Sequence, residues 1–301
     1  MLTRRQISEK IPDLKIYENE PMHAHTSFGT GGAARLFALP AGAEQIKELM
    51  DLCKSSEEKY ALIGKGSNIL VGDRGFDGVI ICLGDEFAQV KIDGDSILAQ
   101  AGASLIGIAA AAKRAGLSGL EFACGIPGSL GGAVFMNAGA YGGEMKDIVK
   151  TVTVMKPDGK VMQLSGEEMH FGYRHSRAME EELIILDAKM QLAFGDEKEI
   201  SAAMSELMKR RAEKQPIQYP SAGSTFKRPQ GYFAGKLIED AGLKGFSIGG
   251  AQVSEKHCGF VINKDHASSA DILSLCEHIQ KTVFEKTGVA LEMEVRKLGD
   301  F

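Results

Sequence analysis

An α+β fold in two parts is predicted by three features of this sequence. Segments with the helical spacing of apolar residues are mixed with short β-rich runs. Glycine accounts for 36 of the 301 residues, above the usual share of about 7%, and the excess is clustered. The character of the chain changes near Gly195, where a charged helix follows, and a length of 301 residues itself favours two or three domains.

The glycine-rich body is expected to extend to about residue 195. Residues 1–25 suggest a helical lead-in and a polar loop, and residues 42–59 have the spacing of an amphipathic helix. A second helix is predicted over 104–115, with Ser104 as its N-cap and Gly116 as its C-cap. Strands are predicted at 60–63, 69–71, 79–83, 90–92, 97–101, 151–155, 161–164 and 183–192.

The smaller C-terminal part, 196–301, mixes three helices with short strands. Pro216 and Pro220 bracket a loop after its first helix. The helices are predicted at 196–214, 234–241 and 268–286, and the strands near 249–253, near 258–262 and at 290–297.

Composition and charge exclude several classes of protein. Apolar residues at 44% and charged residues at 25% are typical of a packed globular chain. The net charge of −5, without a basic run, argues against a nucleic-acid partner. No run approaches the roughly 18 apolar residues of a membrane span, and the N-terminus shows no signal peptide, so we expect no membrane partner. Five unpaired cysteines favour reduced, buried thiols and a cytoplasmic location, and the scattered histidines predict no metal site.

The familiar nucleotide-binding loops fail on spacing. Gly64-Lys-Gly66-Ser-Asn follows a predicted strand, but Ile69 stands where a dinucleotide loop needs its third glycine, and no helix follows. The segment from Gly231 to Lys236 is one residue short of a P-loop, and no G-x-S-x-G elbow is present.

Two other glycine loops remain, at 64–68 and 125–142. Glycine lets a main chain approach a ligand closely, so that successive N–H groups can converge on phosphate oxygens. One such loop would more often be an ordinary turn, but seven glycines within 125–143 make that interpretation strained.

Three further stretches carry reactive side chains. Phe171–Ser176 contains Arg174, which from pattern alone is most often a solvated surface charge. Residues 219–229 place hydroxyls in a loop between prolines, where a Gly-Ser turn is the simpler interpretation. Alternation over 291–296 puts Glu292, Glu294 and Arg296 on one strand face, a pattern that by itself favours a wet edge strand.

Taken in order, these motifs resemble the UDP-N-acetylenolpyruvoylglucosamine reductase family. The resemblance extends from about residue 23 to the end of the chain. It rests on HTSFGTGG (25–32), IGKGSNILV (63–71), GIPGSLGGAVFMNAGAYG (125–142), FGYRHS (171–176), SAGSTFKRP (221–229), AGKLIEDAGLKG (234–245) and LEMEVRKLG (291–299).

The resemblance implies a two-subdomain FAD-binding fold of the vanillyl-alcohol oxidase and p-cresol methylhydroxylase type, followed by a smaller α+β substrate domain. Mapped onto this chain, the FAD-binding domain covers 1–195, with subdomains at about 20–83 and 84–195, and the substrate-binding domain covers 196–301. The short connection between Leu192 and Lys214 resembles the compact form of the family, which lacks an inserted tyrosine loop.

The resemblance also implies cofactors and site residues. FAD would be bound non-covalently, with NADPH as hydride source, and the catalytic positions fall on Ser224, Arg174 and Glu294. The cofactor-binding positions are Gly64, Lys65, Gly66, Ser67, Asn68, Gly125, Pro127, Gly128, Ser129, Gly131, Gly132, Asn137, Ala138 and Gly139. Candidate substrate-binding residues are Tyr173, Arg211, Lys214, Lys227, Arg228, His257 and Arg296.

The implied reaction is reduction of the enolpyruvyl group of UDP-N-acetylglucosamine enolpyruvate during peptidoglycan precursor synthesis. Two alternatives stay open at this point. One is another flavoenzyme of the same superfamily, such as an alcohol or sugar oxidase with a covalently tethered flavin. The other is a nucleotide-sugar binding protein that has lost its flavin.

Overall fold

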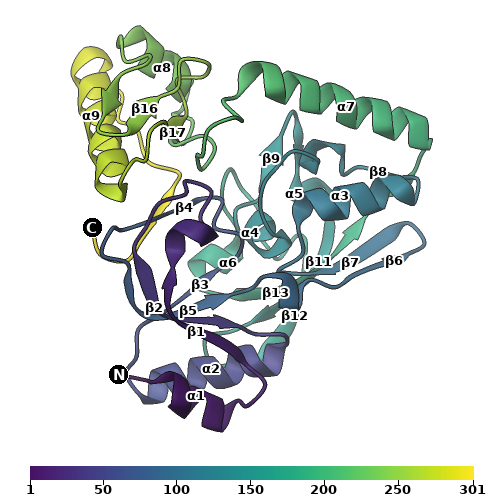
Figure 1. Cartoon of the computed structure of the whole chain (residues 1–301). Helices are drawn as coiled ribbons and strands as arrows, with labels where there is room; N and C mark the ends of the chain where they lie inside the picture. The colour runs from purple at the N-terminus through teal and green to yellow at the C-terminus, as the bar shows by residue number, and fades with distance from the viewer. The chain divides into compact units, whose positions relative to one another are not determined.

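The computed structural model (Figure 1) describes every residue from Met1 to Phe301. By its internal contacts the chain divides into two units. The first unit contains Met1–Tyr17, Phe37–Lys65 and Ile80–Arg210, and the second contains Glu18–Leu36, Gly66–Val79 and Arg211–Phe301. Each unit is assembled from separated stretches of chain, whereas the sequence suggests the contiguous parts 1–195 and 196–301.

A five-stranded antiparallel sheet forms the centre of the first unit. Its order is β12–β11–β13–β7–β6, so strands distant in sequence pair at its middle. In the register Val152 lies opposite Leu164 on one side and Ala188 on the other, and all three are buried. The strands are β6 (Val90–Asp93), β7 (Ser96–Gln100), β11 (Val149–Met155), β12 (Val161–Ser165) and β13 (Ile184–Gln191), which confirms the five predicted there.

Helices of this unit also follow the sequence. In α2 (Ala43–Ser55) the residues that become buried are the predicted ones, Ile46, Leu49, Met50 and Cys53. The Ser104 hydroxyl accepts the Gly107 N–H at the start of α3 (Leu105–Arg114), as its capping role requires. The other elements are α1 (Arg4–Lys10), η2 (Asp85–Phe87), β8 (Leu117–Ser118), η3 (Glu121–Ala123), α4 (Leu130–Phe135), β9 (Gly139–Ala140), β10 (Gly143–Glu144), α5 (Met145–Ile148), α6 (Arg177–Glu180) and β14 (Ala193–Phe194), followed by α7 (Glu197–Lys214).

A second sheet has the order β1–β2–β5–β3, and two of its strands were not predicted. The bounds are β1 (Lys15–Pro21), β2 (Ala33–Leu39), β3 (Tyr60–Ile63) and β5 (Phe76–Cys82). Only Ile16 of β1 is buried, so this strand lacks the alternation of apolar and polar residues that would predict it. In β2, buried residues are consecutive and the strand contains three alanines, a composition that does not favour strands.

In the second unit a small sheet packs against a long helix. The sheet has the order β15–β16–β17, and α9 contacts all three of its strands (Figure 1). Ser268 and Asp271 form a capping box at the start of α9, and the Asp73 carboxylate accepts the next two N–H groups, from Ser269 and Ala270. The elements are η1 (Met22–His25), β4 (Ile69–Val71), α8 (Ala234–Asp240), β15 (Ser247–Ile248), β16 (Ala251–Val253), β17 (Val261–Asn263), α9 (Ser269–Thr287) and β18 (Arg296–Leu298).

The predicted strand over 290–297 is wrong in its extent. Regular pairing begins only at Arg296, where β18 runs parallel to β4. Before it, the chain pairs with a loop through the single bridge between Phe226 and Met293, which is too short to count as a strand.

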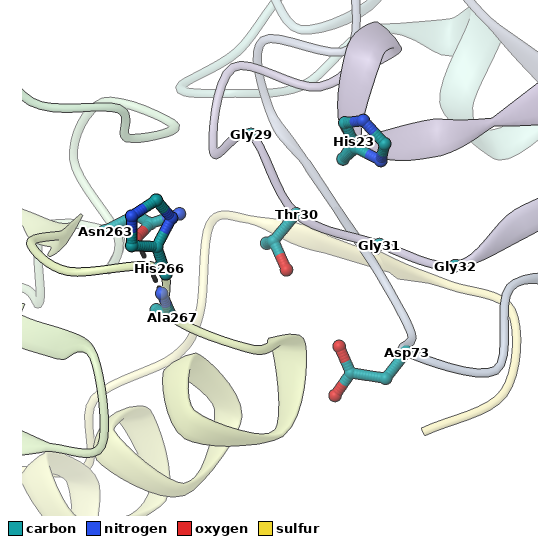
Figure 2. Close-up of a pocket in the computed structure, with 9 residues that line it drawn as sticks. All are labelled: His23, Gly29, Thr30, Gly31, Gly32, Asp73, Asn263, His266 and Ala267. Atoms are coloured by element: carbon teal, nitrogen blue, oxygen red, sulfur yellow. Dashed lines mark hydrogen bonds between the residues drawn. The ribbon is translucent and has the colours of Figure 1, made fainter.

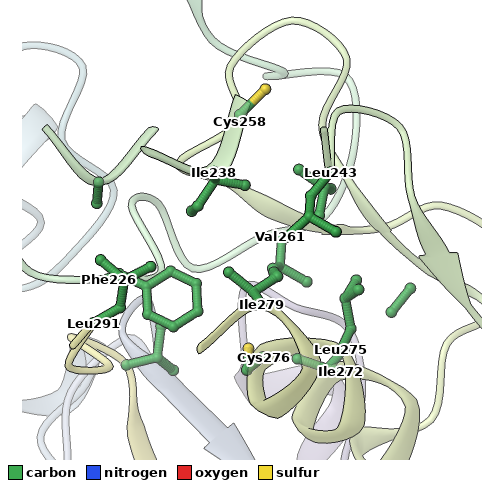
Figure 3. Close-up of a cluster of buried hydrophobic side chains, with 14 of the residues drawn as sticks. Phe226, Ile238, Leu243, Cys258, Val261, Ile272, Leu275, Cys276, Ile279 and Leu291 are labelled. Carbon is green, nitrogen blue, oxygen red and sulfur yellow. The ribbon is translucent and has the colours of Figure 1, made fainter. Parts of the chain in front are cut away.

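One apolar cluster fills the second unit. It joins α8, α9 and the small sheet, and Ile238, Val261 and Cys276 are among its members (Figure 3). Phe226 and Leu291 belong to the same cluster (Figure 3). The two segments joined by the Phe226–Met293 bridge are therefore each anchored in the core by an apolar side chain.

Candidate active site

The two predicted glycine loops meet in the first unit. A Cβ atom on Gly64 would lie 2.1 Å from Ser129 Oγ, so the two loops approach closely enough that a larger residue at 64 would displace the Ser129 side chain. The second loop is fixed by its own main chain, since the Leu105 N–H donates to Gly128 O (3.0 Å) and the Leu130 N–H to Ala103 O (2.9 Å). Main-chain hydrogen bonds thus tie the second loop to residues 103–105.

The rest of the first loop lies in the second unit, against the segment 25–28. Gly66 has a φ of +59°, and a Cβ there would lie 1.9 Å from His25 O. The Ser27 N–H donates to Gly66 O (3.2 Å), and the Asn68 amide donates to the main-chain oxygen of Glu294 (3.1 Å). The loop predicted to bind the cofactor is therefore tied directly to a predicted catalytic position.

The chemistry of these loops fits a pyrophosphate-bearing cofactor such as FAD. The predicted cofactor-binding residues offer main-chain N–H groups, hydroxyls, amides and one ammonium group, and they include no carboxylate. Among the residues with hydroxyl groups, Ser129 is buried. The ammonium group belongs to Lys65, which is exposed and pairs with Asp85 at 3.4 Å. These contacts with a cofactor remain predictions.

Arg174 sits in a tight turn of residues 172–176, which we call the Arg174 turn. Gly172 and His175 exchange main-chain hydrogen bonds of 3.1 and 3.3 Å across it. Arg174 itself has a φ of +53°, a conformation that is uncommon for residues other than glycine. Its guanidinium lies 5.1 Å from the centre of the Tyr173 ring, and this tyrosine is 53% exposed.

Asn137 is predicted to bind the cofactor, but its side chain is occupied by the protein. Its Nδ2 donates to Glu144 Oε2 and to Gly172 O, both at 2.9 Å, and its Oδ1 accepts the Lys146 N–H at 2.9 Å. Its main-chain N–H also donates within the protein, to Val134 O at 3.2 Å. The sequence does not identify Glu144 as a site residue. The only hint of its contact with Asn137 is that the two residues are seven positions apart.

Ser224 and Glu294 belong to two antiparallel segments of the second unit, 224–227 and 292–294, which we call the Ser224–Glu294 ladder; Glu294 is paired with Thr225, the residue after Ser224. The Glu294 N–H donates to Thr225 O (2.8 Å), and the Lys227 N–H donates to Glu292 O (2.9 Å). Ser224 is exposed and follows Gly223, whose φ is +76°. Glu294 is half-buried, with its Oε2 fully covered.

The candidate substrate-binding residues are placed as follows. Lys227 pairs with Glu292, and the Arg228 guanidinium lies 4.5 Å from the centre of the Phe233 ring. Burial lowers the pKa of His257, whose Nδ1 accepts the Gly259 N–H at 3.1 Å. Arg211, Lys214, Lys227, Arg228, His257 and Arg296 all belong to the same unit as Ser224, and Tyr173 belongs to the unit of Arg174.

A shallow pocket of about 360 Å³ lies elsewhere in the second unit (Figure 2). It contains none of the predicted catalytic, cofactor-binding or substrate-binding residues. Its lining is His23, Gly29, Thr30, Gly31, Gly32, Asp73, Asn263, His266 and Ala267.

The cysteines and histidines show no assembled metal site. No group of three or more His, Cys, Asp or Glu residues is placed to hold a metal ion. All five cysteines are free thiols, and burial raises the pKa of Cys82 and of Cys276 to about 12. None of the helices is long and apolar enough to span a membrane.

Comparison with known proteins first defines the class. Residues 34–165 match the FAD binding domain family, which defines the class as an FAD-binding protein of mixed α+β architecture. Residues 215–298 match the family described as UDP-N-acetylenolpyruvoylglucosamine reductase, C-terminal domain.

Full-length relatives then define the family. The chain is 50% identical over 288 residues to the UDP-N-acetylenolpyruvoylglucosamine reductase of Limosilactobacillus fermentum, covering 96% of each chain. It is also 50% identical over 295 residues to that of Caldanaerobacter subterraneus, covering 98% and 97%. The crystal structure of the reductase from Thermus caldophilus superposes with a TM-score of 0.81 at 34% identity, covering 95% of this chain and 98% of that one. The chain therefore belongs to the UDP-N-acetylenolpyruvoylglucosamine reductase family, and it is of the short form of about 300 residues.

Proposed function

We propose that this chain uses NADPH and non-covalently bound FAD to reduce the enolpyruvyl group of UDP-N-acetylglucosamine enolpyruvate, giving UDP-N-acetylmuramate for peptidoglycan. Family membership supports the overall reaction. The observation that carries the site is the pairing of residues 225–227 with 292–294, which brings the exposed Ser224 to the position next to Thr225, the main-chain partner of Glu294.

The substrate defines what the protein must supply. Its C=C bond is conjugated to a carboxylate, so addition of hydride at C3 leaves negative charge at C2 that spreads into that carboxylate. FAD, when bound, carries the hydride from NADPH to C3. The protein must then deliver a proton to C2 and stabilise the enolate with a cation or a hydrogen-bond donor.

Ser224 suits the proton-delivery step because it is both exposed and held in place. Its neighbour Thr225 is fully buried, and the Thr225 hydroxyl accepts the Val261 N–H at 2.9 Å. The left-handed Gly223 precedes it. The hydrogen bonds of Thr225 hold the main chain directly after Ser224, which suits a positioned proton donor.

Arg174 and Glu294 suit the stabilisation of the enolate. Arg174 supplies a permanent positive charge, and its planar guanidinium can donate two hydrogen bonds to a carboxylate. Glu294, when it carries a proton, supplies a neutral donor. The diphosphate of the substrate would be bound by cations among Arg211, Lys214, Lys227, Arg228, His257 and Arg296, with Tyr173 as a further contact.

The two half-reactions test this function separately. In anaerobic stopped-flow absorbance, the wild-type flavin should bleach with NADPH and regain its colour with UDP-N-acetylglucosamine enolpyruvate. Ser224→Ala should bleach normally, because flavin reduction needs no proton at C2, and should regain colour on the order of 10²-fold more slowly. Ser224→Cys, which keeps an ionisable proton, should lie between the two.

A merely structural Ser224 predicts a different result. Both half-reactions would then stay near normal, or both would fall together because the loop had shifted. A rate of reoxidation close to wild type in Ser224→Ala would remove the proposed acid. A wild-type protein whose reduced flavin is not reoxidised by the substrate would contradict the proposed function itself.

The cytoplasmic location and the small-molecule partner belong to the same proposal. Five free and mostly buried thiols support a reducing compartment. Release of the yellow chromophore into the supernatant on denaturation would support non-covalent FAD over the tethered flavin of an oxidase.

A further inference from the structure

The Arg174 turn is attached at both of its ends to the glycine-rich loop. At its first residue, Gly172 O accepts the Asn137 amide at 2.9 Å. At its last residue, the Ser176 hydroxyl donates to Phe135 O at 2.7 Å. Asn137 and Ser176 are 1% and 0% exposed, so water cannot substitute readily for either bond.

The Asn137 amide is itself oriented by its neighbours. Glu144 Oε2 accepts its second N–H, and the Lys146 N–H donates to its oxygen, each at 2.9 Å. This leaves one orientation of the amide, the one that points an N–H at Gly172. Lys146 Nζ lies 3.0 Å from the same Glu144 oxygen.

Charge links this network to Arg174 as well. Hydrogen bonds from Lys146 and Asn137 lower the pKa of Glu144, and the positive charge of Arg174 contributes in the same direction. The carboxylate that orients the amide is thus also close enough to attract the guanidinium.

We propose that Asn137 and Ser176 form a clamp, oriented by Glu144, that positions Arg174 for the reaction. They are positioning residues, since they act on the substrate only through the placement of Arg174. The inference rests on the proposed function, because it assumes that Arg174 stabilises the enolate. It adds that the loop expected to bind FAD and the arginine expected to bind substrate are held in register by side chains from residues 135–144 and 172–176.

The Arg174 conformation explains why a clamp is needed. A left-handed arginine costs about 1 kcal/mol or more relative to ordinary backbone, so the surrounding contacts must maintain it. Loss of either end of the clamp should let the turn relax. A displacement of about 1 Å is enough to cost up to roughly 10²-fold in rate.

The test is a double-mutant cycle on the rate of flavin reoxidation by UDP-N-acetylglucosamine enolpyruvate. Asn137→Gly removes the amide yet tolerates the φ of +44° at this position, and Ser176→Ala removes the hydroxyl. Each should slow reoxidation about 10-fold or more in the wild-type background. In an Arg174→Ala background, each should have less than about a twofold effect, because the clamp then has nothing to position.

Ser96→Ala is a matched control. Ser96 is also a buried serine of the first unit, and its hydroxyl donates to the main-chain oxygen of Asp93 at 2.9 Å. Its replacement should lower thermal stability about as much as Ser176→Ala while leaving reoxidation unchanged. Flavin occupancy, measured from the ratio of visible to ultraviolet absorbance, should stay at the wild-type level in every variant. Should Asn137→Gly fail to fold, Ser176→Ala alone completes the cycle.

The outcomes separate this inference from the proposed function. Equal slowing in the presence and absence of Arg174, or slowing by Ser96→Ala as well, would overturn the clamp. So would normal reoxidation in both clamp variants when Arg174→Ala is slow. If the wild-type flavin is not reoxidised by substrate at all, the proposed function fails instead.

Discussion

The Arg174 turn and the Ser224–Glu294 ladder hold their reactive side chains by different kinds of bond. In the ladder the contacts are main-chain hydrogen bonds, such as that from the Glu294 N–H to Thr225 O, and the apolar side rests in a core with Phe226 and Leu291. In the turn the anchoring bonds come from the side chains of Asn137 and Ser176.

This difference determines which substitutions should destabilise each region. A main-chain ladder does not depend on the identity of Ser224 or Glu294, so their substitution should change chemistry with little change in fold. The turn depends on the identity of side chains that never contact the reacting atoms. Substitutions of the ladder should therefore separate catalysis from stability, whereas substitutions of the clamp should affect both.

The largest effect should come from the two groups assigned to the enolate. Arg174→Lys keeps the charge but loses the planar pair of donors, and removal of one such stabilising group typically costs on the order of 10²-fold or more in rate. Glu294→Gln keeps a neutral donor and should cost clearly less than Glu294→Ala. Reoxidation rates at saturating substrate, together with thermal melting of the same samples, measure both predictions.

Equal losses for Gln and Ala at 294 would show that Glu294 does not act as a neutral donor. The melting temperatures sharpen the comparison between the two regions. Glu294→Gln should melt like wild type, because its main chain carries the ladder bond. A large loss of stability in that variant would contradict the independence of the ladder from its side chains.

An intermediate effect, on stability alone, is expected from Thr225. Its hydroxyl accepts the buried Val261 N–H at 2.9 Å, and Thr225→Val would leave that donor without an acceptor. The cost should be about 1–3 kcal/mol in the free energy of unfolding. Ser224→Ala, one residue away and exposed, should stay within about 0.5 kcal/mol of wild type.

Chemical denaturation of the flavin-free proteins measures both values. If Ser224→Ala were as destabilising as Thr225→Val, slow reoxidation in that variant could no longer be assigned to a lost proton donor. The adjacent pair thus serves as its own control for the experiment on Ser224.

Much of the fold follows from local patterns in the sequence. The helices at 43–55, 105–114 and 269–287 and the five strands of the large sheet were predicted because each has regular apolar spacing or a capping residue. Strand β1 was missed because only Ile16 of it is buried. The strand predicted at 290–297 is too long. Alternation of apolar and polar residues indicates which side chains are buried, but it does not indicate over how many residues a neighbouring strand pairs.

The site was predictable only in part, for a related reason. Motifs identified the glycine loops and the reactive residues, but the Asn137–Gly172 and Ser176–Phe135 bonds join residues 35 and 41 positions apart. No local pattern reports such a contact. Asn137 stood out as a possible ligand for the cofactor, and its three hydrogen bonds inside the protein became visible only with the fold.

The smallest effect we expect is a pH dependence of the folding stability that arises from His257, a residue beside the ladder. Its Nδ1 accepts the Gly259 N–H, Gly259 O accepts the Thr225 N–H at 2.9 Å, and its ring packs edge-on against Phe260 at 5.0 Å between centres. Burial lowers the pKa of His257 below its usual value of about 6.5, and the bond to Nδ1 likewise requires the neutral ring. The unfolded chain therefore binds a proton more readily than the folded chain, and stability should fall as the pH drops below about 6.5.

The ring of His257 is covered only in part and the residue as a whole stays exposed, so solvent screens the charge and keeps the effect on stability small. His257→Gln removes the titrating ring and keeps an oxygen able to accept the Gly259 N–H. Urea unfolding at pH 7.5 and at pH 5.5 should show a larger loss at low pH for wild type than for this variant. Identical losses of stability in the two proteins would mean that protonation of His257 does not destabilise the ladder region. The Arg174 turn lies in the other unit, so the Ser176→Ala variant should keep the wild-type pH dependence and show that the response belongs to the ladder region alone.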